Sequence, residues 1–222
     1  MKYYLLHHPD FSRDMDRLHA EWTQDRDSRG GREFEAAIGA MKALREAREG
    51  EFEGKRLAYG PQSYDLRDCA ELKVPVEREF TPRGGELGPS HRLVYREFDP
   101  LPKVEGHRVV PDPDARPYRQ LLAFAHRSQA PADIAGERLG RERGLMDPEL
   151  YGVGSGERPS VGPQREGMPT TPYRVPVPGD LLKQAQILRD SPPAGTAPKP
   201  AEAPQAMVNR SGPAGPDRAK GR

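Results

Sequence analysis

Residues 90–98 read Ser90-His91-Arg92-Leu93-Val94-Tyr95-Arg96-Glu97-Phe98, and this stretch decides the fold that the sequence predicts. In an extended chain Arg92, Val94, Arg96 and Phe98 lie on one side, and the residues between them lie on the other. Valine, tyrosine and phenylalanine favour a pleated, half-buried surface, so the stretch predicts a β-strand. Burying a guanidinium without a partner is costly, so we expect Arg92 to emerge at a groove or to meet an anion.

Aromatic residues and prolines divide the chain into two parts. All six phenylalanines and the one tryptophan lie at or before Phe124, whereas 14 of the 25 prolines come after residue 147. This shift predicts a packed domain over residues 1–144 and a disordered tail, rich in proline and glycine, over residues 145–222.

One segment of the tail, residues 180–190, has the pattern of a short helix. Asp180 can cap it, and Leu181, Ala185 and Leu188 form one apolar face. A helix this short is marginal alone in water, so we expect it to bind either the domain or another protein. The alternative is an inert, solvated tail.

Charge and cysteine content narrow the class of protein. Residues 1–145 carry 25 Lys and Arg against 26 Asp and Glu, so a site for an anion has to be a local cluster. The single cysteine, Cys69, fits a reducing cytoplasm. No apolar run approaches the roughly 18 residues of a membrane span, so we expect no membrane contact.

Periodicity predicts an α+β domain in which an N-terminal strand and a helical hairpin pack on a small four-stranded sheet, followed by a short helix. Strands are expected at residues 2–7, 66–76, 91–98 and 118–127. Helices are expected around 11–22, 34–44 and 133–143. The first has the apolar stripe Phe11, Met15, Leu18, Trp22, and the second has Phe34, Ile38, Met41, Leu44 together with Ala37. Residues 51–62, 77–88 and 101–117 are expected to be loops.

Four segments in this order resemble the RelE/ParE toxin superfamily. They are residues 1–18, with a short strand before Pro9-Asp10-Phe11, and residues 65–73, 91–96 and 123–127, which resemble the second, third and last strands of that family. The resemblance covers about residues 1–143. It implies a toxin held by a cognate antitoxin protein.

RelE-like members are ribosome-dependent endoribonucleases, so the resemblance implies cleavage of mRNA in the ribosome. The ribose 2′-OH attacks the adjacent phosphate without a metal or cofactor. This chemistry needs a base for the hydroxyl, a cation for the charge that grows on the phosphate, and a proton for the leaving oxygen.

The resemblance also implies site residues. By position, Arg92 and Arg127 match the phosphate-stabilising arginines, and Lys73 matches one of two lysines on the second strand. His126 is the candidate acid or base, because histidine titrates near neutral pH. Two further strand and loop cations, Arg96 and Arg67, are candidate RNA contacts.

Three departures from the family favour an alternative, a non-catalytic ParE-like or degenerate member that acts by binding protein. Glu71 stands where the other lysine is expected, residues 128–134 lack the tyrosine that follows the last strand, and the domain is neutral. In that case the strand cations only pair with acids across the sheet, and Lys73 only protects a sheet edge.

The sequence gives little support for a cysteine nucleophile, a metal site or a phosphate-binding loop. Cys69 has no evident triad, and the histidines lack the spacing of metal ligands. The glycine pair at residues 84–85 lacks the lysine and the strand–helix context of a phosphate loop.

Overall fold

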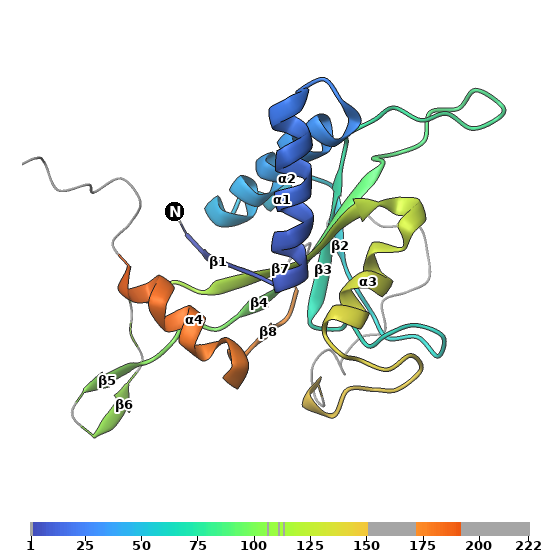
Figure 1. Ribbon diagram of the computed structural model, residues 1–222. Helices are drawn as coiled ribbons and strands as arrows, with labels where there is room; N and C mark the ends of the chain where they lie inside the picture. Colours follow the sequence, from blue (N-terminus) through green and yellow to red (C-terminus); the bar gives the residue numbers. More distant parts are fainter. Residues whose placement is uncertain (1, 106, 111, 113, 151–171, 192–222) are drawn as a thin grey trace, which may run out of the picture. The chain divides into compact units, whose positions relative to one another are not determined.

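The computed structural model describes residues 2–105, 107–110, 112, 114–150 and 172–191. Its main sheet has the order β1-β7-β4-β3-β2, and a further short strand, β8, pairs with β4 (Figure 1). These strands are β1 (Tyr4–His7), β2 (Gly54–Arg56), β3 (Cys69–Val74), β4 (His91–Phe98), β7 (Tyr118–His126) and β8 (Arg174–Val175). Helices α1 (Pro9–Gln24), α2 (Arg29–Glu46), α3 (Pro131–Arg138) and α4 (Gly179–Asp190) accompany the sheet, so the predicted α+β class is confirmed.

Strand β4 is the centre of the sheet, as its sequence predicts. It is antiparallel to β3 on one side and to β7 on the other, and β1 then adds in parallel to β7. Leu93 and Tyr95 enter one apolar cluster while Val94 enters another, which is the expected alternation. The two faces of β4 therefore support two separate cores.

The α1/α2 hairpin covers the face that carries Leu93 and Tyr95. Phe11, Met15 and Leu18 of α1 are buried there, as their spacing predicts. The predicted stripe of α2 is partly wrong, because Ile38 is 43% exposed; Ala37 and Leu44 are buried as expected, and Ala40 is fully buried in addition. Small side chains let α2 approach the sheet closely.

Side chains cap the first two helices. The Nδ1 atom of His8 accepts a hydrogen bond from the backbone N–H of Asp10 and caps α1. The hydroxyl of Ser28 caps α2 by accepting from the backbone N–H of Gly31.

Helix α3 packs on the opposite face of the sheet. Ala135 joins Val94 and Leu122 in the second core, together with Tyr64 and Leu66 from the segment before β3. Leu122 and Ala123 both contribute to this core because the β4–β7 pairing shifts register between Val94 and Tyr95. The bulge thus widens the surface on which α3 rests.

The C-terminal described segment completes the sheet. Strand β8 pairs with residues Glu97 and Phe98 of β4, beyond the point where β3 begins. Leu181 and Ala185 of α4 then pack with Leu6, Phe98 and Tyr118 in a third core. The predicted helix at residues 180–190 is confirmed, and it binds the domain in cis.

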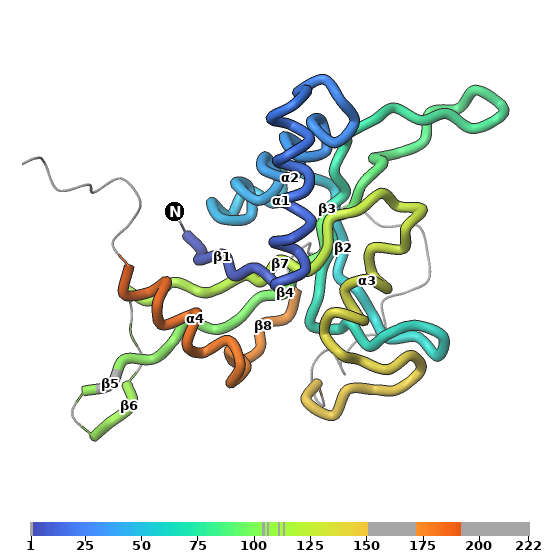
Figure 2. The backbone as a smooth tube through the Cα atoms, viewed as in Figure 1, coloured from blue at the N-terminus to red at the C-terminus, as the bar shows by residue number. Residues whose placement is uncertain are grey.

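Several predicted boundaries are wrong. Residues 51–62 contain β2, and residues 101–117 contain the hairpin β5 (Lys103–Glu105) and β6 (Arg108–Val110), seen as a separate loop in Figure 2. Strand β3 begins at Cys69 rather than residue 66, and α3 ends at Arg138 rather than residue 143. β2, β5 and β6 have three residues each and β8 has two, which is too short to establish an alternation.

The compact unit runs from Met1 to Asp190, so it includes residues 172–190, which the composition assigns to the tail. The remaining tail predictions, for residues 151–171 and 192–222, lie outside the described residues. None of the helices in the described part of the chain is long and apolar enough to cross a membrane.

Candidate functional site

The register between β3 and β4 brings two of the predicted cations together. Lys73 lies directly opposite Arg92 in the antiparallel pair. Residues in such positions share a face and have neighbouring side chains. The predicted site residues Lys73 and Arg92 therefore lie side by side on one face of the sheet.

Arg92 is held mainly by backbone carbonyl groups. Its Nη1 atom donates to the oxygens of Pro89 and His91, at 2.6 and 2.8 Å. Its Nε atom lies 3.6 Å from Oε1 of Glu71, which is an ion pair but a loose one. The side chain is 16% exposed, so Arg92 does meet an anion at a partly open position.

Glu71 joins this cluster from the same face of β3. Its carboxylate is 9% exposed and lies 3.6 Å from the Nζ atom of Lys55 as well as near Arg92. Lys73 points to another acid, since its Nζ atom lies 3.0 Å from Oε2 of Glu53. Each predicted cation on β3 and β4 thus has a carboxylate partner.

Arg127 and His126 stand at the end of β7 and share one carboxylate. Nε2 of His126 lies 2.7 Å from Oε1 of Glu79, and Nη2 of Arg127 donates to Oε2 of the same group. Arg127 follows the strand instead of ending it, because β7 stops at His126 and a short 3-10 helix, η2 (Arg127–Gln129), begins. Its backbone N–H still donates to the oxygen of Ser90 at 2.8 Å, which keeps it beside β4.

The two arginines meet at one turn of the backbone. Nη1 of Arg127 donates to the oxygen of Gly88 at 2.7 Å, and Arg92 binds the oxygen of the next residue, Pro89. Lys73, Arg92 and Arg127 therefore all lie at the same end of the sheet, each held by its own partners.

His126 belongs to the opposite face of the sheet. It pairs with His91 in register, and the two rings meet edge to face with centroids 5.2 Å apart. His91 is itself buried between Phe124 and Glu33. His126 reaches Arg127 only because Glu79 spans the end of the sheet.

The contacts of Glu79 with His126 and Arg127 determine the direction in which the pKa of its carboxyl is shifted. The hydrogen bond with His126 lowers the pKa of the Glu79 carboxyl, and the charge of Arg127 acts in the same direction. Glu79 is therefore ionised at neutral pH and neutralises the charge of Arg127.

Arg96 and Arg67 lie apart from this cluster. Arg96 is opposite Cys69, the first residue of β3, whereas Arg92 is opposite Lys73 near its end. Four residues along a strand span about 13 Å. Arg67 is held by both oxygens of Asp65, at 2.8 and 2.7 Å. Arg96 and Arg67 are thus separate from the other four predicted site residues.

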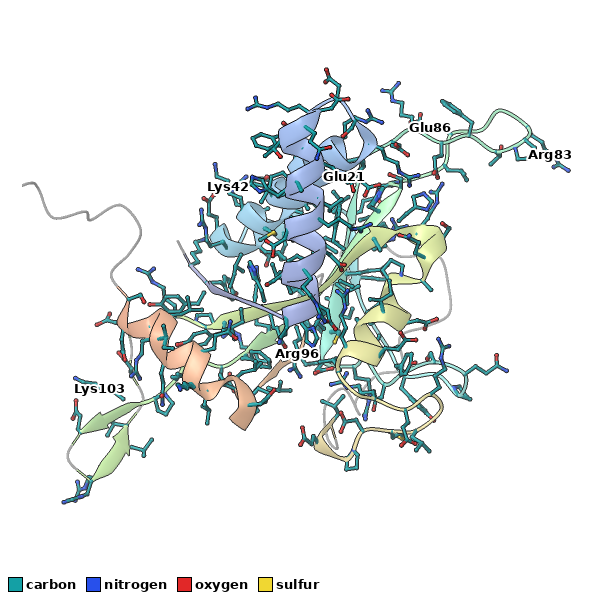
Figure 3. The ribbon with its side chains drawn as sticks, viewed as in Figure 1. Glu21, Lys42, Arg83, Glu86, Arg96 and Lys103 are labelled. Atoms are coloured by element: carbon teal, nitrogen blue, oxygen red, sulfur yellow. The ribbon has the colours of Figure 1, made fainter. Side chains whose placement is uncertain are left out.

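Arg96 lines a polar cavity of about 510 Å³ (Figure 3). Its Nε atom donates to Gln120 at 2.7 Å, its Nη1 atom lies 3.8 Å from Asp68, and burial lowers its pKa. Asp68 is already bound through both oxygens by Arg141, at 2.7 and 2.8 Å. The cavity carries acids as well as bases, including Asp147, Glu149 and Asp180. Because acidic and basic side chains line the same cavity, its charge does not favour a nucleic-acid phosphate over other ligands.

Two acids of the site, Glu71 and Glu79, cannot be recognised from the sequence as partners of the predicted cations. The sequence places Glu71 in one row with Lys73 and marks it as a departure from a lysine, but it does not reveal that Glu71 pairs with Arg92. Glu79 had no local signal, because its partners lie 47 and 48 positions further along the chain. Only the fold brings it to His126 and Arg127.

Other reactive groups are not organised for catalysis. Cys69 is buried, and burial raises the pKa of its thiol, so it is a poor nucleophile. In the part of the chain that the structure describes, no group of three or more His, Cys, Asp and Glu side chains is arranged to hold a metal ion.

Comparisons with known proteins give no relative from which a role could be transferred. No family model matches the chain, and neither the curated proteins nor the solved structures searched contain a significant match.

Proposed function

We propose that residues 1–144 form a RelE-like endoribonuclease domain that cleaves mRNA in the ribosome by 2′-OH attack, without a metal. The observation that carries this proposal is the convergence of Lys73, Arg92 and Arg127 at one end of the sheet, next to the carboxylate of Glu71. Cations and an acid from different strands are what phosphate cleavage without a metal requires.

Each group has a role in this reaction. Glu71 accepts the proton of the 2′-OH as its oxygen bonds to phosphorus. Arg92 and Arg127 stabilise the added negative charge on the phosphate, and Lys73 supports them. His126 donates its Nε2 proton to the leaving 5′-oxygen, which yields a 2′,3′-cyclic phosphate and a free 5′-hydroxyl.

The proposal predicts that Arg92 and Arg127 are required for transcript cleavage. Induction of the wild-type chain should slow growth and cut mRNA, whereas the double variant Arg92→Ala, Arg127→Ala should do neither. Loss of one such charge-stabilising group costs about 10²–10³ in rate. Growth curves and mapping of transcript 5′-ends measure both effects.

The matched control is the double variant Arg17→Ala, Arg83→Ala, which removes the same charge from exposed positions. It should behave like the wild type. If the wild type and the Arg92→Ala, Arg127→Ala variant leave growth and transcripts equally intact, the nuclease proposal is wrong.

A second candidate, a non-catalytic member that binds protein, then becomes the better explanation. Two observations favour it, namely the carboxylate partner of each predicted cation and the exposed apolar side chains of Phe80 and Leu87, which are 59% and 38% exposed. Exposed apolar residues on a projecting loop are typical of contacts with other proteins.

A further inference from the structure

Residues 77–88, which we call the arm, connect β3 to β4 and extend away from the end of the sheet (Figure 1). Arg83 and Glu86 mark its outer part in Figure 3. Glu79 is the arm residue whose side chain binds His126 and Arg127, and the carbonyl oxygen of Gly88 accepts a further hydrogen bond from Arg127. The carboxylate that binds His126 and Arg127 therefore comes from a loop and not from a strand of the sheet.

Two donors define the position that Glu79 occupies. The backbone N–H of Ser128 donates to Nδ1 of His126, so the hydrogen of the neutral ring is on Nε2 and points to Glu79. Arg127 supplies the second donor from its Nη2 atom. One carboxylate thus accepts from two fixed donors on consecutive residues, which is the arrangement of an oxyanion site.

A phosphodiester suits the same two donors. It is a monoanion with two non-bridging oxygens, and guanidinium groups bind carboxylates and phosphates in the same fork geometry. The next cation along the backbone turn is Arg92, which is bound to Pro89 while Arg127 is bound to Gly88. A strand of RNA that replaced Glu79 would meet Arg127 first and Arg92 next.

The arm is built so that it can release Glu79. Between Glu79 and Leu87 its backbone hydrogen bonds close on the arm itself, for example from the N–H of Leu87 to Glu79 and from the N–H of Gly85 to Thr81. The two ends of the arm, Glu77 and Gly88, are held by Ser90 and Arg127. Its apolar side chains Phe80 and Leu87 are exposed rather than packed. Segments with few buried apolar contacts open at low free-energy cost.

We propose that Glu79 is a removable internal competitor for the phosphate position of the RNA-binding site. With the arm closed, its carboxylate fills that position, and with the arm open, an RNA phosphate takes its place on Arg127 and His126. This inference rests on the proposed RNA site, but it concerns binding and does not require cleavage.

The test compares Glu79→Ala with Glu86→Ala in the full chain. Both variants remove one negative charge from the arm, but the carboxylate of Glu86 pairs with the exposed Arg78, at 3.7 Å, and not with the His126–Arg127 pair. The probe is a short, fluorescein-labelled single-stranded RNA with 2′-O-methyl sugars, which cannot be cleaved by 2′-OH attack. Fluorescence anisotropy at one fixed salt concentration measures the dissociation constant.

We expect Glu79→Ala to bind the probe at least about tenfold more tightly than the wild type, and Glu86→Ala to stay within about twofold of it. Adding Arg127→Ala to Glu79→Ala should abolish the gain. Equal affinities for Glu79→Ala and wild type, or an equal gain in Glu86→Ala, would overturn the inference. A gain in binding to the methylated probe without cleavage of unmodified RNA would support the inference and contradict only the nuclease activity.

Discussion

Arg119 is fully buried in β7, and its charge is satisfied by groups from three parts of the chain. It donates to Glu97 at 3.0 Å, to Glu49 at 2.8 Å and to the carbonyl oxygen of Leu44 at 2.6 Å. Burial alone would lower its pKa, but the hydrogen bond with Glu49 and the surrounding charges raise it overall. Arg119 therefore stays charged in the core and joins α2 to the sheet.

Replacement of Arg119 by alanine should lower the free energy of unfolding by about 3–5 kcal/mol. The reason is that Glu49 and Glu97 would keep buried charges without their common partner. Urea denaturation at neutral pH measures the change. Arg13→Ala is the control, because Arg13 pairs with Asp10 while 77% exposed, and it should cost less than about 1 kcal/mol. Equal losses of unfolding free energy in Arg119→Ala and Arg13→Ala would contradict the role of Arg119 as the common partner of Glu49 and Glu97.

Single residues also show what the sequence could and could not predict at the site. The alternation of residues 90–98 correctly places Arg92 and Arg96 on one face, and the family resemblance selects Arg127. The same pattern cannot distinguish a buried structural arginine such as Arg119 from a partly open one such as Arg92. The difference lies in partners from remote segments, such as Glu49 and Glu79.

Among the elements, α3 owes its position to a contact between a glycine and an aromatic ring. A Cβ atom at Gly136 would lie 2.2 Å from Cγ of Tyr64, so the helix rests directly on the ring. Tyr64 is 7% exposed and belongs to the core that α3 covers. The close approach explains why a glycine is present inside a short helix.

The contact between Gly136 and Tyr64 predicts that two Gly→Ala changes in helices have opposite effects on stability. Gly136→Ala should destabilise the protein by about 1–3 kcal/mol, since α3 or Tyr64 has to move. Gly39→Ala in α2 has nothing within 4 Å of the new Cβ, so its better helix propensity should add about 0.5–1 kcal/mol. Thermal unfolding of both variants tests the pair. A loss at Gly39 or no loss at Gly136 would contradict the packing described.

Elements were predictable where they are long and periodic. Strands β4 and β7 and helix α1 follow from their apolar patterns. The stripe of α2 is only partly predictable, because alanines carry little hydrophobic signal, and Ala40 and Ala43 are buried beside the expected Ala37 and Leu44. Strands β2, β5 and β6 are formed by tertiary pairing and not by local preference.

For the molecule as a whole, residues 172–190 are part of the packed body. The hydroxyl of Tyr118 donates to the carbonyl oxygen of Ala185 at 3.1 Å, and Arg174 donates to Glu97 at 2.5 Å. The composition of this region predicted a tail, because it has many prolines and few aromatics. Its apolar partners Leu6, Phe98 and Tyr118 come from the first 118 residues, so local composition could not reveal the packing.

This packing predicts unequal effects for two adjacent leucines of α4. Leu181→Ala should lower the free energy of unfolding by about 2–4 kcal/mol, because the side chain is 8% exposed and fills the third core. Leu182→Ala, at a position 38% exposed, should cost less than about 1 kcal/mol. Chemical denaturation of the full chain distinguishes them. Equal, small losses would show that α4 is not docked.

The parallel pairing of β1 with β7 has a consequence for biosynthesis. Tyr4 aligns with Tyr118, so the first strand made has to wait until 114 further residues have been translated. At about 5–20 residues per second, the nascent chain spends several seconds with β1 lacking this partner. The α1/α2 hairpin can form in that interval because its contacts are local, whereas sheet closure must follow late, when β7 leaves the ribosome.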